Sequence, residues 1–435
     1  MPGHRRLRVG AGVGNWVDVD LAYGSTGMRV RLPASATVIT PRPRHAAPDP
    51  VATLRDAIAR PVAGPSLREI ARQGQRVAIS VCDVTRPQPR ELMLGALMEA
   101  LDGVIRPEDV VVLIATGTHR ASTPEERRAM LGDTVLSAWR VIDHDSRDRS
   151  SLVDLGMVGD VPVLLNREWV DADLRITTGF VEPHFFAGFS GGPKMVAPGL
   201  AGIDTTLELH NARRIGDPRA TWGVVEGNPV HDAVRAIAAA TGVGFALDVL
   251  LDDRQRITSA FGGEILAMHA AACAEARREA MRSVDASFDV VVTTNSGYPL
   301  DQNLYQAVKG MSAAAEVVRD GGTIVCAAEC RDGLPDHGSY GTLLHEGRSP
   351  ADLLERIAAS PVTIPDQWQV QIQARVQARA RVMLRSDGLS DDAVRAAHLE
   401  PVADVSDTVA RLVADDPSAR ICVLPQGPQT MAYVA

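Results

Sequence analysis

Lysine is nearly absent from this chain of 435 residues. Lysine and arginine together number 45, yet only Lys194 and Lys309 are lysines and all the others are arginine. A deprotonated lysine offers a nucleophilic amine, which can form a covalent bond that a guanidinium cannot. Biased codon usage alone would also leave few lysines, but both lie in polar, glycine-containing segments that follow predicted strands. The scarcity therefore marks both lysines as candidate functional residues.

Excess positive charge, long apolar runs and paired cysteines are also lacking. The net charge is −9 and the pI is near 5.7, which argues against nucleic acid or an anionic membrane as the main partner. No run reaches about eighteen apolar residues, and the opening MPGHRRLRVG has no apolar core, so we expect neither a membrane span nor a signal peptide. The five cysteines are scattered, and CAAEC is not a CxxC pair. We therefore expect no disulfide, no zinc site and a cytoplasmic location.

Apolar runs alternate with helical patterns along most of the chain. Three runs in the first half each end in a polar cluster: RVAISVCD at 76–83, DVVVLIATG at 109–117 and ADLRITTGF at 172–180. Such nearly continuous runs are typical of a parallel sheet covered on both faces. We predict an α/β fold, in which ligands bind beyond the carboxyl ends of the strands.

The length indicates two domains, because a single core rarely serves 435 residues. We expect a first α/β domain over residues 1–285, completed by residues 418–435, and a second over residues 286–417. Both sheets should be mostly parallel, with an active-site cleft between the domains. Alternating runs between residues 7 and 39 predict short strands, and PRPRHAAPDP predicts an extended linker.

Polar residues follow all three runs of the first domain. Asp83, Thr85 and Arg86 come after the first run, His119 after the second and His184 after the third. Parallel strands share one carboxyl edge, so we expect both histidines at that edge. A single histidine is more often structural, but a pair can take up and return protons on two faces of one substrate. Arg86 can offer a planar fork to a carboxylate.

The segment SGGPK contains Ser190, Gly191 and Gly192 just before Lys194. Glycines let backbone amides approach a phosphate, but GxxxxGK[ST] is absent, so phosphate contact and simple loop geometry remain equal alternatives. His210 is predicted to lie on a helix. One protein ligand does not hold a metal without a chelating cofactor, so the alternative is a capping or solvent-facing histidine.

The second domain offers a further polar group in the helix predicted at LYQAVKG. Tyr305 and Lys309 are four residues apart and share a face, which Gln306 borders. Trp368 lies in PDQWQVQIQARVQARARVML, which we predict to be one long helix. For Tyr305, Gln306 and Lys309, each taken alone, the alternative is a charged, solvated surface.

Several motifs together resemble one known family over nearly the whole chain, from Tyr23 to Val434. They are DVTRPQP, ATGTHR, EPHFFAGFSGGPKMVAPG, PLDQNLYQAVKG, DQWQ and LPQGPQT. The chain resembles the nickel-pincer-nucleotide-dependent lactate racemase family. The resemblance implies two α/β domains and a cofactor derived from a nicotinic-acid nucleotide, with nickel held by sulfur, carbon and sulfur.

The resemblance also implies roles for individual residues. Lys194 would attach the cofactor covalently through a thiocarboxyl arm, and His210 would be the protein ligand of nickel. By the same resemblance Asp83 and Thr85 would contact the cofactor, and the glycine-containing loop adds Ser190, Gly191 and Gly192 as candidate cofactor contacts. The usual asparagine before the nickel histidine is replaced here by Leu209.

The family's acid/base pair corresponds to His119 and His184. One imidazole would take the hydroxyl proton while the hydrogen on carbon leaves as hydride to the cofactor, which gives a planar 2-keto acid. The residues implied to hold the substrate are Arg86, Tyr305, Gln306, Lys309 and Trp368.

We therefore expect a cytoplasmic racemase or epimerase of a 2-hydroxy acid, loaded by cofactor-biosynthesis proteins. One alternative is a non-catalytic protein that binds a nucleotide or nickel cofactor, which would need Lys194 and His210 but not both His119 and His184. Another is a metal-dependent hydrolase using His144 or His231, although the sequence lacks the multi-histidine spacing of such enzymes.

Overall fold

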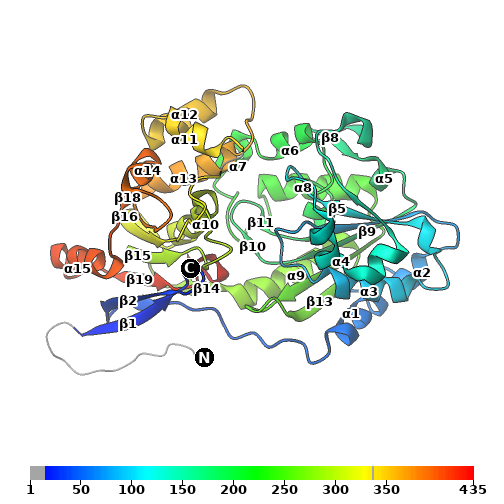
Figure 1. Cartoon of the computed structure of the whole chain (residues 1–435), viewed down its shortest axis with the longest axis horizontal. Coiled ribbons are helices and arrows are strands. Elements are labelled where there is room, and N and C mark those ends of the chain that lie inside the picture. Colours follow the sequence, from blue (N-terminus) through cyan, green and yellow to red (C-terminus); the bar gives the residue numbers. More distant parts are fainter. Residues whose placement is uncertain (1–14, 336–337) are drawn as a thin grey trace. The chain divides into compact units, whose positions relative to one another are not determined.

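The computed structural model describes residues 15–335 and 338–435. Residues 1–14 lie outside this part. They include the start of the region predicted to form short strands and the opening MPGHRRLRVG, for which we expected no signal peptide. Two compact units are present: a central unit, Arg42–Glu279, and a terminal unit, which combines Ala280–Ala435 with Met1–Pro41 (Figure 1). Among the described residues, no helix is long and apolar enough to cross a membrane.

The central unit contains a six-stranded sheet in the order β13-β12-β9-β4-β5-β6. Its strands are β4 (Val77–Cys82), β5 (Val110–Ala115), β6 (Arg140–Asp143), β9 (Leu174–Phe180), β12 (Phe245–Leu251) and β13 (Ile257–Gly263). All neighbours pair in parallel except β12 and β13. The chain runs from β4 through β5 to β6 and then crosses to β9, so the strand order reverses at β4. Such a reversal is where ligands bind in open α/β sheets.

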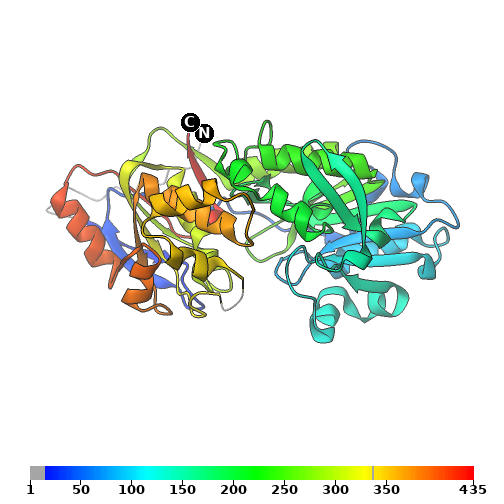
Figure 2. The ribbon, with the colours of Figure 1, turned by 90° about the horizontal axis from the view of Figure 1, so that it is seen from above.

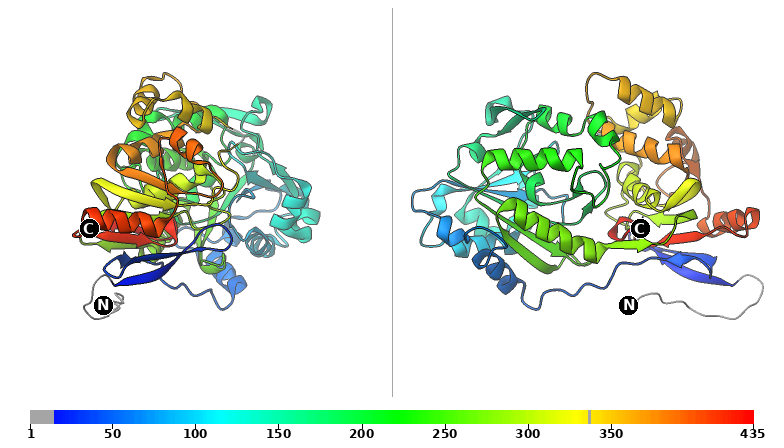
Figure 3. Two further views of the ribbon diagram at one scale, coloured as in Figure 1. Left: turned by 60° about the vertical axis from the view of Figure 1, so that its left-hand side comes forward. Right: turned by 180° about the vertical axis from the view of Figure 1, so that it is seen from behind.

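Helices cover both faces of this sheet. They are α1 (Pro50–Ala59), α2 (Leu67–Ile70), α3 (Arg90–Leu101), α4 (Pro124–Ala138), α5 (Arg167–Val170), α6 (Ile203–Leu209), α7 (Ala212–Gly216), α8 (Pro229–Thr241) and α9 (Ile265–Ala280). On one face, α1 to α4 pack against Ile79, Val112 and their neighbours. On the other, α5, α8 and α9 pack against Ala78 and Val111. Figure 2 shows these layers from above, and the rear view in Figure 3 brings α8 and α9 forward. The two covered faces explain why the strands are apolar along their whole length.

Smaller elements complete the central unit. Two antiparallel hairpins are formed by β7 (Leu152–Val158) with β8 (Val161–Asn166) and by β10 (Pro183–His184) with β11 (Gly188–Phe189). Short 3-10 helices cover Pro107–Asp109, Arg149–Ser151 and Gly192–Met195. The last of these contains Lys194. The lysine therefore lies in a short 3-10 helix that follows the β10–β11 hairpin.

The terminal unit has a second six-stranded sheet, in the order β18-β17-β16-β15-β19-β3, and all its pairs are parallel. Its strands are β3 (Thr37–Val38), β15 (Phe288–Thr294), β16 (Val318–Ala327), β17 (Arg381–Arg385), β18 (Glu400–Pro401) and β19 (Ile421–Leu424), and two further pairs join β1 (Trp16–Leu21) to β2 (Met28–Pro33) and β14 (Met281–Val284) to β20 (Met431–Val434). The predicted α/β class with two largely parallel sheets is confirmed.

The helices of the terminal unit also lie on both faces of its sheet. They are α10 (Leu304–Ala315), α11 (Tyr340–Glu346), α12 (Pro350–Ala359), α13 (Gln367–Arg379), α14 (Asp391–Ala396) and α15 (Val405–Asp415), with a 3-10 turn at Gly427–Gln429. The β1–β2 hairpin and α15 bury one face, around Leu32, Val292 and Val409, and Figure 3 shows hairpin and helix side by side. Helices α10 and α13 pack on each other and on β16.

The expected domain limits need correction at both ends of the chain. Residues 418–435 do not return to the first sheet, because β19 pairs with β15 and β20 pairs with β14 in the terminal unit. Strand β3 also pairs with β19, which places the start of the chain in the same unit. A four-residue apolar strand such as Ile421–Leu424 is compatible with either sheet, so its sequence pattern did not determine its partner.

Ile79 provides a test of the central core. It is fully buried at the middle of β4, so Ile79→Ala should lower the free energy of unfolding by about 2–5 kcal/mol through lost contacts and a residual cavity. The control Val62→Ala alters a side chain of the same unit that is 49% exposed, and it should change the value by less than about 0.5 kcal/mol. Urea denaturation followed by circular dichroism measures both. Equal effects would show that β4 is not central to the core.

Candidate active site

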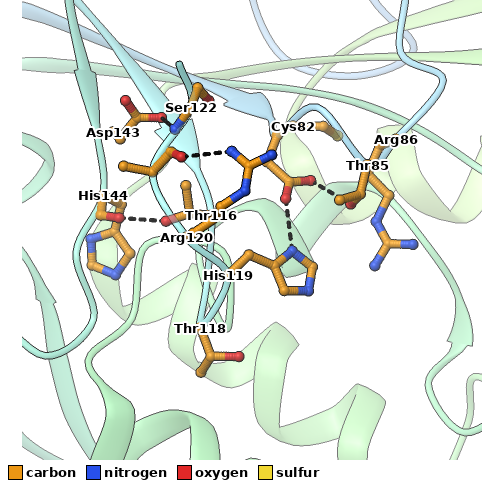
Figure 4. Close-up of polar contacts among 12 residues, drawn as sticks. Cys82, Thr85, Arg86, Thr116, Thr118, His119, Arg120, Ser122, Asp143 and His144 are labelled. Atoms are coloured by element: carbon orange, nitrogen blue, oxygen red, sulfur yellow. Dashed lines mark hydrogen bonds and ion pairs between the residues drawn. The ribbon is translucent and has the colours of Figure 1, made fainter. Parts of the chain in front are cut away.

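Two adjacent parallel strands bring Asp83 and His119 together. Asp83 directly follows β4, and His119 lies on the turn after β5. Nδ1 of His119 lies 2.7 Å from Oδ2 of Asp83, and the hydroxyl of Thr85 donates to Oδ1 at 2.8 Å (Figure 4). The carboxylate is buried whereas the histidine side chain is 48% exposed. The pair therefore has a buried, fixed end and an accessible imidazole.

The charge on Asp83 decides the tautomer of His119. Burial alone would raise the pKa of Asp83, but the hydrogen bond and charge of His119, with the nearby Arg86 and Thr85, hold it below its ordinary value. An ionised carboxylate only accepts hydrogen bonds, so Nδ1 of His119 must donate. In the neutral ring the lone pair is then on Nε2, which is the arrangement of a general base oriented by a carboxylate.

A buried arginine shapes the loop that carries Asp83 and Arg86. Arg90, at the start of α3, donates through Nε to the carbonyl of Cys82 (2.7 Å) and through Nη1 to that of Gln88 (3.0 Å). Its Nη2 donates to the carbonyl of Arg86 at 2.8 Å and also bonds the carbonyl of Asp83. The side chain of Arg86 is exposed, so its guanidinium is accessible to a ligand.

His184 is held in the opposite tautomer. It ends β10, and the chain turns at once into β11, so the amides of Phe186 and Ala187 point back to the ring. Nδ1 of His184 accepts from these amides at 3.4 and 3.3 Å. In the neutral ring the proton is then on Nε2. In their neutral forms one candidate imidazole thus has its lone pair at Nε2 and the other has its proton there, which is the difference between a base and an acid.

The ring of Phe186 brings three candidate residues together. Its centroid lies 4.5 Å from that of His184 and 5.2 Å from that of His210, both in edge-on geometry. The ammonium of Lys194 lies 5.6 Å from the same ring. The predicted attachment lysine, the predicted nickel ligand and one predicted acid/base histidine therefore surround a single aromatic side chain.

His210 is buried directly after α6 and is neutral at pH 7. Its Nδ1 donates to the carbonyl of Thr206 at 2.7 Å, which leaves the lone pair on Nε2. Burial lowers the pKa of His210 to about 4, and the charge of Lys194 lowers it further against the opposing effect of the Thr206 carbonyl. A histidine whose second nitrogen is fixed by a carbonyl is the usual form of a metal ligand.

Protein groups account for the glycine pair before Lys194. The amide of Gly192 donates to Oδ2 of Asp248 at 2.6 Å. A Cβ on Gly191 would lie 2.6 Å from the same oxygen, and one on Gly192 would lie 2.5 Å from the ring of His269. The hydroxyl of Ser190 donates to the carbonyl of Phe180 at 2.8 Å. Of the two alternatives, simple loop geometry explains these residues, and contact with a phosphate stays a prediction.

The terminal unit brings its four predicted substrate residues together. Asn303 caps α10, which carries Tyr305, Gln306 and Lys309. Nζ of Lys309 donates to the side-chain oxygen of Gln306 at 2.7 Å. The indole of Trp368, on α13, donates to the hydroxyl of Tyr305 at 3.2 Å. The predicted helical face is therefore present, with an ammonium and a hydroxyl on it.

The remaining histidines of the hydrolase alternative are engaged in the fold. Nε2 of His144 donates to the carbonyl of Ala201 at 2.9 Å, and Nδ1 accepts from Asn166 at 3.2 Å. Nδ1 of His231 donates to the carbonyl of Ala187 at 3.1 Å. Within residues 15–335 and 338–435, no group of three or more His, Cys, Asp or Glu side chains is arranged to hold a metal ion.

Comparison with known proteins covers both units. A family model for the lactate racemase N-terminal domain matches residues 23–223, and one for the lactate racemase C-terminal domain matches residues 283–431. The chain belongs to the lactate racemase family. This is an isomerase family. The resemblance drawn from the motifs is thereby confirmed at the level of the family.

Relatives in the lactate racemase family align with most of the chain. It is 34% identical to a lactate racemase of Thermoanaerobacterium thermosaccharolyticum over 379 residues, 86% of this chain and 88% of the relative. It is 35% identical to a lactate racemase of Lactiplantibacillus plantarum over 382 residues, 86% and 89% of the two chains.

Two solved structures share the fold. The lactate racemase apoprotein of T. thermosaccharolyticum superposes with a TM-score of 0.88 at 31% identity, over 96% of this chain and all of that one. A crystal structure of a Thermotoga maritima protein gives a TM-score of 0.66 at 18% identity, over 91% of this chain and all of the other. The second likeness concerns the fold alone.

Sequence reasoning missed several side chains that shape this lactate racemase-family site. Phe186, Arg90, Asp248 and His269 were not singled out, although the first two lie inside or beside quoted motifs. Asp248 had a readable signal, because a charged residue inside the apolar strand FALDVLL needs a buried partner. His269 had none, since its partner is the carbonyl of Ser190, far away in the sequence.

Buried histidines give the central unit of this lactate racemase homologue a defined acid sensitivity. Burial lowers the pKa of His231 to about 3 and that of His269 to about 4, so the folded state binds fewer protons than the unfolded state below the ordinary value of 6.5. Stability is therefore present above pH 6.5 and is lost as the pH falls toward 4, by roughly 3 kcal/mol per histidine. Burial raises the pKa of Asp248 to about 7, which acts in the opposite direction.

The variant His269→Gln separates these effects, because Asp248 is unchanged in it. Urea denaturation of both proteins at about pH 7 and about pH 4.5 should show that the variant loses roughly 2 kcal/mol less on acidification than the wild type does. An equal loss in the two proteins would show that His269 does not become protonated on unfolding.

Proposed function

We propose that the protein racemises or epimerises a 2-hydroxy acid at C2, using a covalently bound nickel-pincer nucleotide. The observation that supports this most strongly is the pair of imidazoles held in opposite tautomers, His119 by Asp83 and His184 by the amides of its own turn. Family membership supports the same activity, since both curated relatives are lactate racemases. Lactate is one member of the proposed substrate class.

The donor groups around Phe186 fit this cofactor. Lys194 supplies an amine capable of a covalent bond to a thiocarboxyl arm, and His210 supplies a neutral nitrogen for nickel. Both contact the same ring, so one ligand can reach both. We propose Asp83, Thr85, Ser190, Gly191 and Gly192 as further residues of the cofactor region, the last three by fixing the shape of the loop.

The nickel-pincer nucleotide, when bound, would accept the hydrogen on C2 of the substrate as hydride and supply it again to either face of C2. The imidazoles handle the other hydrogen. His119 accepts the hydroxyl proton at Nε2, and the oxidised substrate is a planar 2-keto acid. His184 carries a proton at Nε2 and can return one to the substrate oxygen. In the reverse reaction the two histidines exchange roles, so that His184 accepts the hydroxyl proton and His119 returns one.

The substrate carboxylate needs cationic partners in a protein of net negative charge. We propose Arg86 for this role, because its side chain is exposed on the loop fixed by Arg90. Lys309 is proposed as a second cation, with Tyr305, Gln306 and Trp368 as further substrate contacts. The amine of Lys309 is held beside Gln306, so its position is defined before any ligand binds.

The proposed setting is the cytoplasm, with cofactor-biosynthesis proteins as partners that load the chain. The cysteines support a reducing compartment, since all five are buried and free.

A panel of enantiopure 2-hydroxy acids tests the function. After cofactor loading, the protein should invert C2 of at least one acid, which chiral chromatography detects, and either enantiomer should yield the same final mixture. A loaded protein that binds the cofactor but inverts no acid in the panel would favour the non-catalytic binding protein instead.

Asp83→Asn tests the role of the carboxylate. The amide can donate to Nδ1 of His119 and so stabilise the tautomer with its proton on Nε2, which should lower kcat by about 10²–10⁴ while KM changes little. The control Asp143→Asn alters another buried strand-end carboxylate, which pairs with Arg127, and it should keep kcat within about threefold of wild type. Initial rates of both variants decide the question. Similar rates for Asp83→Asn and wild type would remove Asp83 from the mechanism.

A further inference from the structure

Four buried polar side chains form hydrogen bonds with the backbone on both sides of Lys194. They are Ser80 on β4, His231 on α8, Asp248 on β12 and His269 on α9, and none is more than 3% exposed. His231 donates to the carbonyl of Ala187 at 3.1 Å, and His269 donates to that of Ser190 at 2.8 Å. Asp248 accepts from the amide of Gly192 at 2.6 Å, and Ser80 donates to the carbonyl of Met195 at 2.9 Å. We call these four side chains the loop clamp.

The loop clamp contacts main-chain atoms from Ala187 to Met195. Because the four side chains come from four different elements, the loop is tied to two strands of the sheet and to helices α8 and α9. The rings of His231 and His269 also stack, with centroids 5.5 Å apart. The fit leaves no room for a side chain at Gly191 or Gly192, since a Cβ there would collide with Asp248 or His269.

Burying three titratable side chains is costly, and such groups are retained mainly where a site uses them. None of the three has a place in the acid/base steps. What they share is their contact with the one segment that carries Lys194. Lys194 is two residues beyond Gly192, whose amide bonds to Asp248, and one residue before Met195, whose carbonyl accepts from Ser80.

A lysine side chain has several rotatable bonds, so its amine can be placed precisely only if its backbone is fixed. An amine that must meet one atom of a bound partner reacts faster when that geometry is set in advance. We propose that Ser80, His231, Asp248 and His269 are positioning residues, which fix the loop and so place the Lys194 amine for bond formation. The purpose of the loop clamp rests on the proposed role of Lys194, but its existence can be tested without the cofactor.

The scarcity of lysine makes the test direct. An amine-directed acylating reagent can label only Lys194, Lys309 and the chain terminus, and peptide mass spectrometry separates them. Lys309 lies in the other unit and serves as an internal reference. Releasing the loop should raise the labelling rate of Lys194 relative to Lys309 by at least about threefold in Asp248→Ala and in His269→Ala, because local opening exposes the amine.

Conservative variants show whether the hydrogen bonds themselves matter. Asp248→Asn keeps an oxygen that can accept from Gly192, and His269→Gln keeps a donor near the position of Nε2, so both should label within about twofold of wild type. His144→Ala is the matched control. It removes an equally buried imidazole that donates to the carbonyl of Ala201 in the same unit, and it should leave the labelling ratio unchanged.

Hydrogen exchange at the Gly192 amide gives a second readout on the full chain without cofactor. The bond to Asp248 should make this amide slow to exchange in wild type and at least about tenfold faster in Asp248→Ala. If Asp248→Ala does not fold, the His269→Ala and His269→Gln pair carries the labelling test.

The proposal is overturned if folded Asp248→Ala or His269→Ala labels like wild type, or if His144→Ala raises the ratio as much as they do. Neither result depends on nickel or nucleotide. A loaded protein without an adduct at Lys194 would refute the proposed role of that lysine, and the labelling ratios would still report on the loop clamp.

Discussion

The candidate site depends on hydrogen bonds that fix each imidazole by one nitrogen. His119 is fixed by a buried carboxylate, His210 by a main-chain carbonyl and His184 by two main-chain amides. The three partners lie just beyond β4, in helix α6 and in the turn between β10 and β11. The second nitrogen then has a defined protonation state, and that state distinguishes a base, an acid and a metal ligand built from the same side chain.

This arrangement follows from the topology of the central sheet. Strands β4 and β5 are parallel neighbours, so residues just beyond their ends meet, as Asp83 and His119 do. The segment after Lys194 reaches the same edge, where the amide of Gly117 donates to the carbonyl of Gly199 at 3.1 Å. The candidate site of the central unit thus lies where the strand order reverses, and buried side chains beneath it hydrogen-bond to its loops.

The sequence predicted what depends on local pattern and strand ends. Apolar runs placed β4, β5 and β9 within a residue or two, and their parallel order implied that Asp83 and His119 share an edge. It did not predict contacts that are distant in the chain, such as Asp248 with Gly192, or the sheet that receives Ile421–Leu424. The helix predicted over residues 365–384 also ends early, at Arg379, because Arg381–Arg385 pairs with β16. Long-range strand pairing overrides local helical preference there.

The scarcity of lysine now has a structural setting. One of the two lysines lies over Phe186 beside the predicted nickel ligand, and the other is bonded to Gln306 on α10. The central claim is that the amine of Lys194 forms a covalent bond to the cofactor, and intact mass spectrometry of the loaded chain tests this most directly. The account predicts an added mass on wild type and on Lys309→Ala, and none on Lys194→Ala. An adduct that persists in Lys194→Ala would contradict it.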